Sequence, residues 1–216
     1  MKNADLKNFG ILCKGRSILD LPEIEKKVDT CYIVNNFDNE LFHFETIFKK
    51  KKIIHFVNRL RTAALKKNTY RYFKINRIQM ATPFNLFDKN FMKSYLTYKY
   101  FCLKVSTMSK EVLHQFHYTG NDAYKNKFPN TGIFSILYAS EILKIKNIYI
   151  VGLDFYTDNY LYKSKTTNPV EITHQRFLNL KIIEFFLDFI EKKSDTNFFL
   201  RTNYQFTYKP KNLILI

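Results

Sequence analysis

Short apolar runs, rich in β-branched and aromatic residues, recur along this chain, and each is followed by polar or turn-forming residues. Runs of this length that are apolar on both faces are typical of parallel strands covered by helices. Six candidate strands follow: residues 9–13, 30–34, 53–57, 75–81, 147–151 and 196–200. The strongest constraint in the sequence therefore favours an α/β fold.

Helical patterns occupy the stretches between these runs. The sequence predicts a helix over 133–143, with Asn130 or Thr131 as the cap of its first turn. A second helix, with a broad apolar stripe, is expected over about 174–192. The aromatic segment 88–128 is also expected to be helical. Alternating strands and helices predict a Rossmann-like domain with a mostly parallel sheet.

The composition agrees with one folded domain over residues 1–216. Hydrophobic residues make up 46% and aromatic residues 17% of the chain, so a core that buries roughly 70% of the unfolded surface is expected and disorder is excluded. No secretory leader and no membrane-spanning run is recognised, so a cytoplasmic protein is expected. The three cysteines form no zinc-ligand pattern, so we expect neither a metal site nor another cofactor.

The chain carries 35 Lys+Arg against 19 Asp+Glu, a formal net charge of +16. Its basic runs are short, and no known nucleic-acid motif surrounds them. We rank a solvated basic surface first and peripheral attraction to the anionic inner face of a membrane second. Nucleic-acid binding ranks third and is not expected.

Polar side chains follow several of the candidate strands. Ser17 lies just beyond the first run, Asn35 and Asn58 follow the second and third, and Asp154 follows the fifth. Ligands in α/β folds bind beyond the carboxyl ends of the strands. Any single Asn is better explained as the start of a turn, but polar residues at several strand ends together favour a binding site.

The segment 130–190 contains the most specific pattern. Thr131 and Gly132 open the predicted helix, whose first backbone N–H groups can face an anion. Gly-Leu-Asp-Phe-Tyr, residues 152–156, follows the next strand, and a polar stretch leads to His174 at the mouth of the last helix. The polar stretch is typical of a surface flap.

Together these segments resemble the bacterial sialyltransferases that use CMP-sialic acid, of the lipooligosaccharide α-2,3-sialyltransferase type. The resemblance covers most of the chain in order, although residues 60–125 match only loosely. The residues that carry it are Lys14-Gly15-Arg16-Ser17-Ile18-Leu19, Val34-Asn35-Asn36-Phe37, Val57-Asn58, Thr131-Gly132-Ile133-Phe134, Gly152-Leu153-Asp154-Phe155-Tyr156, Tyr162 and His174.

The resemblance implies a GT-A-like variant of the Rossmann-like fold with a small lid over about 155–173. It implies inverting, metal-independent transfer of sialic acid or a related sugar acid to a glycan or lipid-linked glycan hydroxyl. His174 would be the general base, and Tyr156 and Tyr162 would hydrogen-bond the departing CMP phosphate. The donor-binding residues it implies are Gly15, Ser17, Asn35, Asn58, Thr131, Gly132, Gly152, Asp154 and Phe155.

These roles are chemically reasonable without the resemblance. Two phenol donors can stabilise the charge that develops on a leaving phosphate, and an imidazole titrates near the pH at which a general base works. Lys14 stands where the family has Asn, and Phe128-Pro129 where it has Arg, so a Kdo-type donor stays open.

Two other classes also stay open. One is a nucleotide-binding enzyme of another reaction class on the same fold. The other is a basic, non-catalytic adaptor that binds polyanions or a membrane surface. Self-association of the chain is likewise left open.

Overall fold

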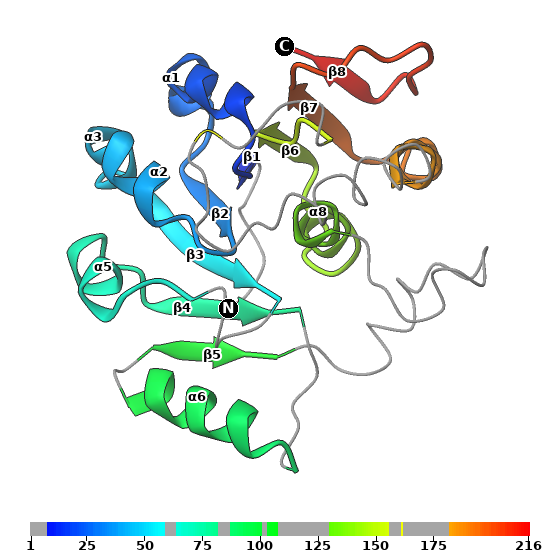
Figure 1. The fold of residues 1–216 in the computed structure, drawn as a ribbon. Helices are drawn as coiled ribbons and strands as arrows, with labels where there is room; N and C mark the ends of the chain where they lie inside the picture. Colours follow the sequence, from blue (N-terminus) through cyan, green and yellow to red (C-terminus); the bar gives the residue numbers. More distant parts are fainter. Residues whose placement is uncertain are drawn as a thin grey trace. The chain divides into compact units, whose positions relative to one another are not determined.

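The computed structural model describes residues 8–58, 64–81, 87–100, 103–107, 130–155, 161 and 182–216 (Figure 1). It is an α/β fold with an eight-stranded, mostly parallel sheet. The predicted fold class is therefore confirmed. The strands are β1 (Asn8–Leu12), β2 (Thr30–Val34), β3 (Lys52–Val57), β4 (Arg77–Met80), β5 (Lys104–Ser106), β6 (Asn147–Val151), β7 (Asn197–Arg201) and β8 (Leu213–Leu215).

The helices are mostly short. The helical elements are α1 (Leu21–Ile24), α2 (Asp38–His43), α3 (Glu45–Phe48), α5 (Lys67–Tyr72), α6 (Lys89–Tyr100), α8 (Thr131–Glu141) and the 3₁₀ turns Arg16–Asp20 and Glu25–Lys27. A further helical stretch covers 182–192. By its contacts the chain divides into two compact units, residues 1–30 with 136–216 and residues 31–135.

In the first unit the strand order is β1-β6-β7-β8. The register pairs Leu12 with Val151 and Val151 with Arg201, so these three strands end at one level. Every β1 and β6 residue after the first of each strand is buried, because such apolar runs need cover on both faces. The carboxyl ends of three strands therefore lie side by side.

In the second unit the order is β5-β4-β3-β2. Its core is aromatic: Tyr32 of β2 meets Phe56 of β3 edge to face, with ring centroids 5.1 Å apart. Phe37, just before α2, and Phe48, the last residue of α3, pack in the same way at 6.0 Å. Helix α6 lies beside β5 (Figure 1).

All six predicted strands are present, with ends shifted by at most two residues. The expected helix over 88–128 is only partly right, since α6 covers Lys89–Tyr100 and β5 follows it, while 108–129 lie outside the described residues. The helix predicted over 174–192 is confirmed for 182–192; its first part also lies outside the described residues.

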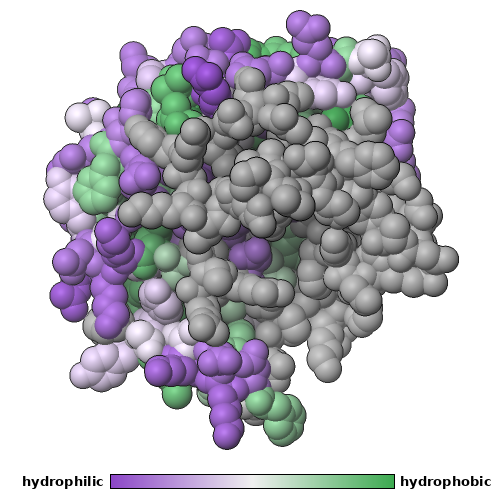
Figure 2. Space-filling view, in the orientation of Figure 1, coloured by the Kyte–Doolittle hydropathy of each residue, from purple (hydrophilic) through white to green (hydrophobic). Residues whose placement is uncertain are grey.

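The surface drawn in Figure 2 is largely hydrophilic where it is described, with smaller hydrophobic areas between. Among the helices of the described ranges, none combines the length and the apolar character needed to span a bilayer.

Candidate functional site

The carboxyl ends of β1 and β6 stay hydrogen-bonded beyond the strands themselves. Cys13 N donates to Val151 O and Gly15 N donates to Gly152 O, both at 2.8 Å. Gly152 has a φ of +77°, and an added Cβ there would clash with the Cys13 carbonyl oxygen. At Gly15 an added Cβ would clash with the Asp154 carboxylate and the Gly152 carbonyl oxygen. Both glycines are therefore required by close backbone approach.

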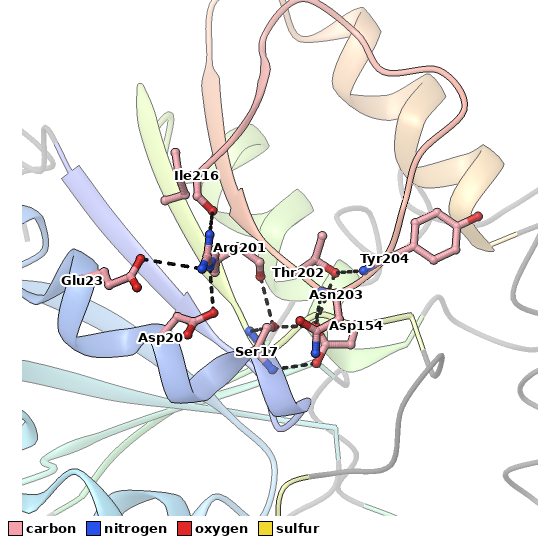
Figure 3. A network of polar contacts seen from close by, with 10 residues as sticks. Ser17, Asp20, Glu23, Asp154, Arg201, Thr202, Asn203, Tyr204 and Ile216 are labelled. Atoms are coloured by element: carbon pink, nitrogen blue, oxygen red, sulfur yellow. Dashed lines mark hydrogen bonds and ion pairs between the residues drawn. The ribbon is translucent and has the colours of Figure 1, made fainter.

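Ser17 and Asp154 join the two strand ends through side chains (Figure 3). Ser17 N donates to Asp154 Oδ2 at 2.9 Å, and the Ser17 hydroxyl donates to Asp154 Oδ1. The same hydroxyl accepts a hydrogen bond from Gly152 N at 3.0 Å. Ser17 is 2% exposed and Asp154 3%. The carboxylate is thus turned inward, where it holds the turn after β1 in place.

The end of β7 completes this network. Asn203 N donates to Asp154 Oδ1 at 3.2 Å, and the Thr202 hydroxyl donates to Leu153 O at 2.8 Å. Three strand ends that are distant in sequence therefore converge on the carboxylate of Asp154 (Figure 3).

Arg201, the last residue of β7, fixes the 3₁₀ turn from the other side. Its Nε donates to Asp20 Oδ2 and its Nη1 to Ile216 O, each at 2.7 Å. The hydrogen bond to Asp20, together with the charges of Asp20 and Glu23, raises the pKa of Arg201. The turn that contains Ser17 is therefore held by two independent sets of polar contacts.

Phe155 follows Asp154 with a φ of +47°, a left-handed backbone that a non-glycine residue rarely adopts. Its ring is 1% exposed and packs against Phe186, Tyr204 and Phe206, with centroids 5.3 to 5.7 Å apart. The left-handed backbone turns the chain sharply at the point where the predicted lid begins, and the packing of the ring holds Phe155 in place.

In the second unit, the structure brings Asn35 and Asn58 together. Asn58 N donates to Asn35 Oδ1 at 3.2 Å, and Asn35 N donates to Phe56 O at 2.9 Å. Asn35 has a φ of +57°, which Asn tolerates better than most residues. Asn58 is exposed. The ends of β2 and β3 thus present two amide side chains at one edge.

Beneath Asn35 lies the fully buried His55. Its Nε2 contacts Asn35 O, which can only accept, so Nε2 carries the proton. Nδ1 then accepts from the Tyr70 hydroxyl at 2.7 Å, and that hydroxyl accepts from Leu65 N at 3.3 Å. Burial lowers the pKa of His55 to about 4 and raises that of Tyr70. The imidazole is therefore a neutral, buried link that supports the backbone of Asn35.

The start of α8 has the predicted cap. Ile133 N donates to Asn130 Oδ1 at 2.9 Å, and Phe134 N donates to Asn130 O. Thr131 is half-buried and Gly132 is buried in the first turn. Asn130 rather than Thr131 supplies the cap.

The three predicted catalytic residues, Tyr156, Tyr162 and His174, lie outside the described residues, as does most of the predicted lid. Of that segment beyond Phe155, Leu161 is described, and its N–H donates to Lys14 O at 3.1 Å. The donor-binding set falls into groups: Gly15, Ser17, Gly152, Asp154 and Phe155 in the first unit, then Asn35 with Asn58, and Thr131 with Gly132. Their roles toward a donor stay predictions.

Within the described ranges, no cluster of three or more His, Cys, Asp or Glu side chains is placed to hold a metal ion. Cys13 and Cys31 are buried free thiols. Burial raises the pKa of each to about 12, and Asp154 adds to the shift at Cys13. Neither thiol is an activated nucleophile.

Thr202, Asn203, His55 and Tyr70 belong to these networks but were not predicted from the sequence. Thr202 and Asn203 directly follow β7, so the rule that singled out the other strand ends applies to them as well. Nothing local in Ile-Ile-His-Phe-Val, residues 53–57, reveals that His55 pairs with Tyr70, because the two meet only in the folded chain.

The chain was compared with protein-family models, with curated proteins and with solved structures, and none of them matches it.

Proposed function

We propose that this chain is a metal-independent, inverting glycosyltransferase that moves sialic acid, or a related sugar acid, from a CMP-activated donor to a glycan hydroxyl. The chain needs no cofactor in this proposal. A glycan or lipid-linked glycan serves as the acceptor, and binding of nucleic acid plays no part.

The observation that supports the proposal most is the set of contacts that holds together the turn after β1 and the turn after β6. Gly15 and Gly152 leave no space for a side chain, and Ser17 and Asp154 hold the two strand ends together. This closure lies beyond the carboxyl ends of parallel strands, where α/β folds bind ligands. The residues involved are also those on which the resemblance to sialyltransferases depends.

The burial of these residues divides the proposed roles. Asp154 and Ser17 are almost fully buried and bonded to one another, so they position the turn rather than touch the donor. Lys14 is half-buried and Arg16 exposed on either side of Gly15. We assign these two cations to the phosphate of the donor, since Lys and Arg stabilise phosphate charge through charge-assisted hydrogen bonds.

In the second unit, Asn58 and Asn35 are assigned to the donor because their amides offer both donors and acceptors at the ends of β2 and β3. Tyr156, Tyr162 and His174 keep the roles that the resemblance implies. His174 takes the proton of the acceptor hydroxyl as the new glycosidic bond forms, and the phenols stabilise the departing CMP phosphate.

The test is release of CMP from CMP-sialic acid in the presence of a panel of oligosaccharide acceptors, with mass spectrometry of the product. Transfer by the wild-type chain and its loss in Lys14→Ala/Arg16→Ala support the proposal. Lys26→Ala/Lys27→Ala is the matched control, because it removes the same charge from exposed positions of the same unit. Loss of activity in both variants, or none in either, would contradict the assignment of the two cations.

The alternatives predict different results. Another nucleotide-dependent enzyme would leave CMP-sialic acid intact and prefer another nucleotide. A basic adaptor would bind polyanions or anionic vesicles in a salt-sensitive way, and His174→Ala would not change that binding.

A further inference from the structure

A cavity of about 340 Å³ lies in the second unit, among α5, α6 and the residues that lead into β4 and β5. Its volume is within the range of about 300–1,000 Å³ that small-molecule sites occupy. The cavity plays no part in the proposed transfer reaction.

The floor of the cavity is apolar and aromatic. Tyr70, Ile75 and Leu103 are buried, and Tyr98 is half-buried beside them. The rings of Tyr70 and Tyr98 meet edge to face with centroids 5.8 Å apart. Since the Tyr70 hydroxyl is engaged by His55, its ring rather than its hydroxyl is available to a ligand. Such a floor accepts a flat or apolar body.

The rim is basic. Lys67, Arg71 and Lys74 are exposed lining residues, and Asn76 adds an amide between them and β4. Lys67 and Arg71 are four residues apart on α5 and so share one helix face. None of the described residues that line the cavity is acidic, and the carboxylate of the nearby Asp38 accepts a hydrogen bond from the Thr69 hydroxyl at 2.7 Å.

The position of the cavity separates it from the candidate donor residues of the same unit. Ile75 and Asn76 precede β4, Leu103 precedes β5, and Lys104 N donates to Asn76 O at 2.7 Å. The cavity therefore lies at the amino ends of β4 and β5. Asn58 follows the carboxyl end of β3, which runs parallel to β4.

We propose that this cavity is a second ligand site, which binds a small phosphorylated molecule with an aromatic or apolar body. The body lies on the two tyrosine rings and the aliphatic floor, and the phosphate meets the three cations of the rim. A free nucleotide and a phospholipid head group both have this chemistry, and the experiment distinguishes them.

The test is isothermal titration calorimetry with phenyl phosphate as the probe. We expect tighter binding of phenyl phosphate than of inorganic phosphate or phenol, because only the first engages rim and floor together. Arg71→Gln/Lys74→Gln should weaken binding at least about tenfold, since two charge-assisted contacts are lost. Lys50→Gln/Lys52→Gln removes the same charge from exposed positions that do not line the cavity and should change affinity less than about twofold.

Two further titrations identify the source. AMP represents nucleotides, and dibutyryl phosphatidic acid represents lipid head groups. The probe that binds more tightly identifies the ligand class, provided that Arg71→Gln/Lys74→Gln weakens its binding. If the double variant fails to fold, Lys74→Gln alone should still weaken binding about threefold. Equal affinity in the two double variants, or no binding of any probe, would overturn the proposal.

Discussion

Ser17 and Asp154 are separated by 137 residues in the chain and are joined by two hydrogen bonds, one from the serine backbone and one from its hydroxyl. The register of β1 and β6 makes this possible, because Leu12 and Val151 end their strands side by side. A short turn after each strand then brings both residues to the same place. This contact is the structural basis of the proposed donor site in the first unit.

The first prediction is that Asp154→Asn destabilises the fold by about 2–3 kcal/mol. Two backbone N–H groups, of Ser17 and Asn203, point at the carboxylate, and an amide can offer them one acceptor oxygen instead of two. Urea unfolding measures the change. The exposed ion-pair residue Asp195 supplies the control, and Asp195→Asn should cost less than about 1 kcal/mol. Equal costs would show that the buried carboxylate has no special role.

The second prediction concerns backbone shape at the same turn. Gly152→Ala should cost about 3 kcal/mol or more, because alanine at a φ of +77° is strained and its Cβ meets the Cys13 carbonyl oxygen. Lys144 has a φ of +56° just beyond α8, with an exposed side chain, and Lys144→Gly should cost nothing or be stabilising. Thermal unfolding of the two variants checks this. A tolerated alanine at 152 would contradict the close approach of the strand ends.

The third prediction follows from His55. Burial lowers its pKa to about 4, against about 6.5 in the unfolded chain, so the unfolded chain binds more protons between these values. The contribution of His55 is therefore complete above pH 6.5 and is lost as the pH falls toward 4. Between pH 7 and pH 5 the free energy of unfolding should drop by about 2 kcal/mol through this group.

His55→Gln tests that assignment. Glutamine can donate to Asn35 O and accept from Tyr70 but does not titrate, so this part of the pH dependence should disappear. The exposed His43 gives the matched control, and His43→Gln should keep the wild-type dependence. An unchanged pH profile in His55→Gln would assign the effect to other groups.

The fourth prediction addresses the chemistry. His174→Ala should leave CMP binding intact and remove most sugar transfer. Tyr156→Phe and Tyr162→Phe should each slow transfer tenfold or more, on the order of 1.4 kcal/mol per lost donor. Steady-state kinetics with CMP-sialic acid measures all three. Transfer by the His174 variant at the wild-type rate would eliminate the base, and Tyr variants within twofold of wild type would eliminate the phenols.

The strands could be predicted because apolar runs that are buried on both faces leave a strong signal in the sequence. The three-residue strands β5 and β8 could not be predicted from the sequence. Lys104-Val105-Ser106 is too short and too polar to be recognised alone, and it becomes a strand only because β4 lies beside it. Such edge strands depend on their neighbours rather than on their own residues.

The candidate site shows the same division. Glycines and polar residues at strand ends could be recognised from the sequence, and Gly15, Ser17, Gly152 and Asp154 do meet. The sequence could not show which of these residues would be buried. The burial of Asp154 depends on Thr202 and Asn203, about fifty residues away in the chain. The pairing of His55 with Tyr70 also depends on tertiary structure alone.

The most direct test of the account is a thermal-shift comparison of CMP, UMP, AMP and GMP at equal concentrations, since a ligand that binds only the folded chain raises its unfolding temperature. It uses the Arg71→Gln/Lys74→Gln background, in which the second cavity has lost two of its cations. The account predicts the largest increase with CMP and a smaller one in Asn58→Ala. A larger increase with a purine nucleotide, or no increase with CMP, would contradict it.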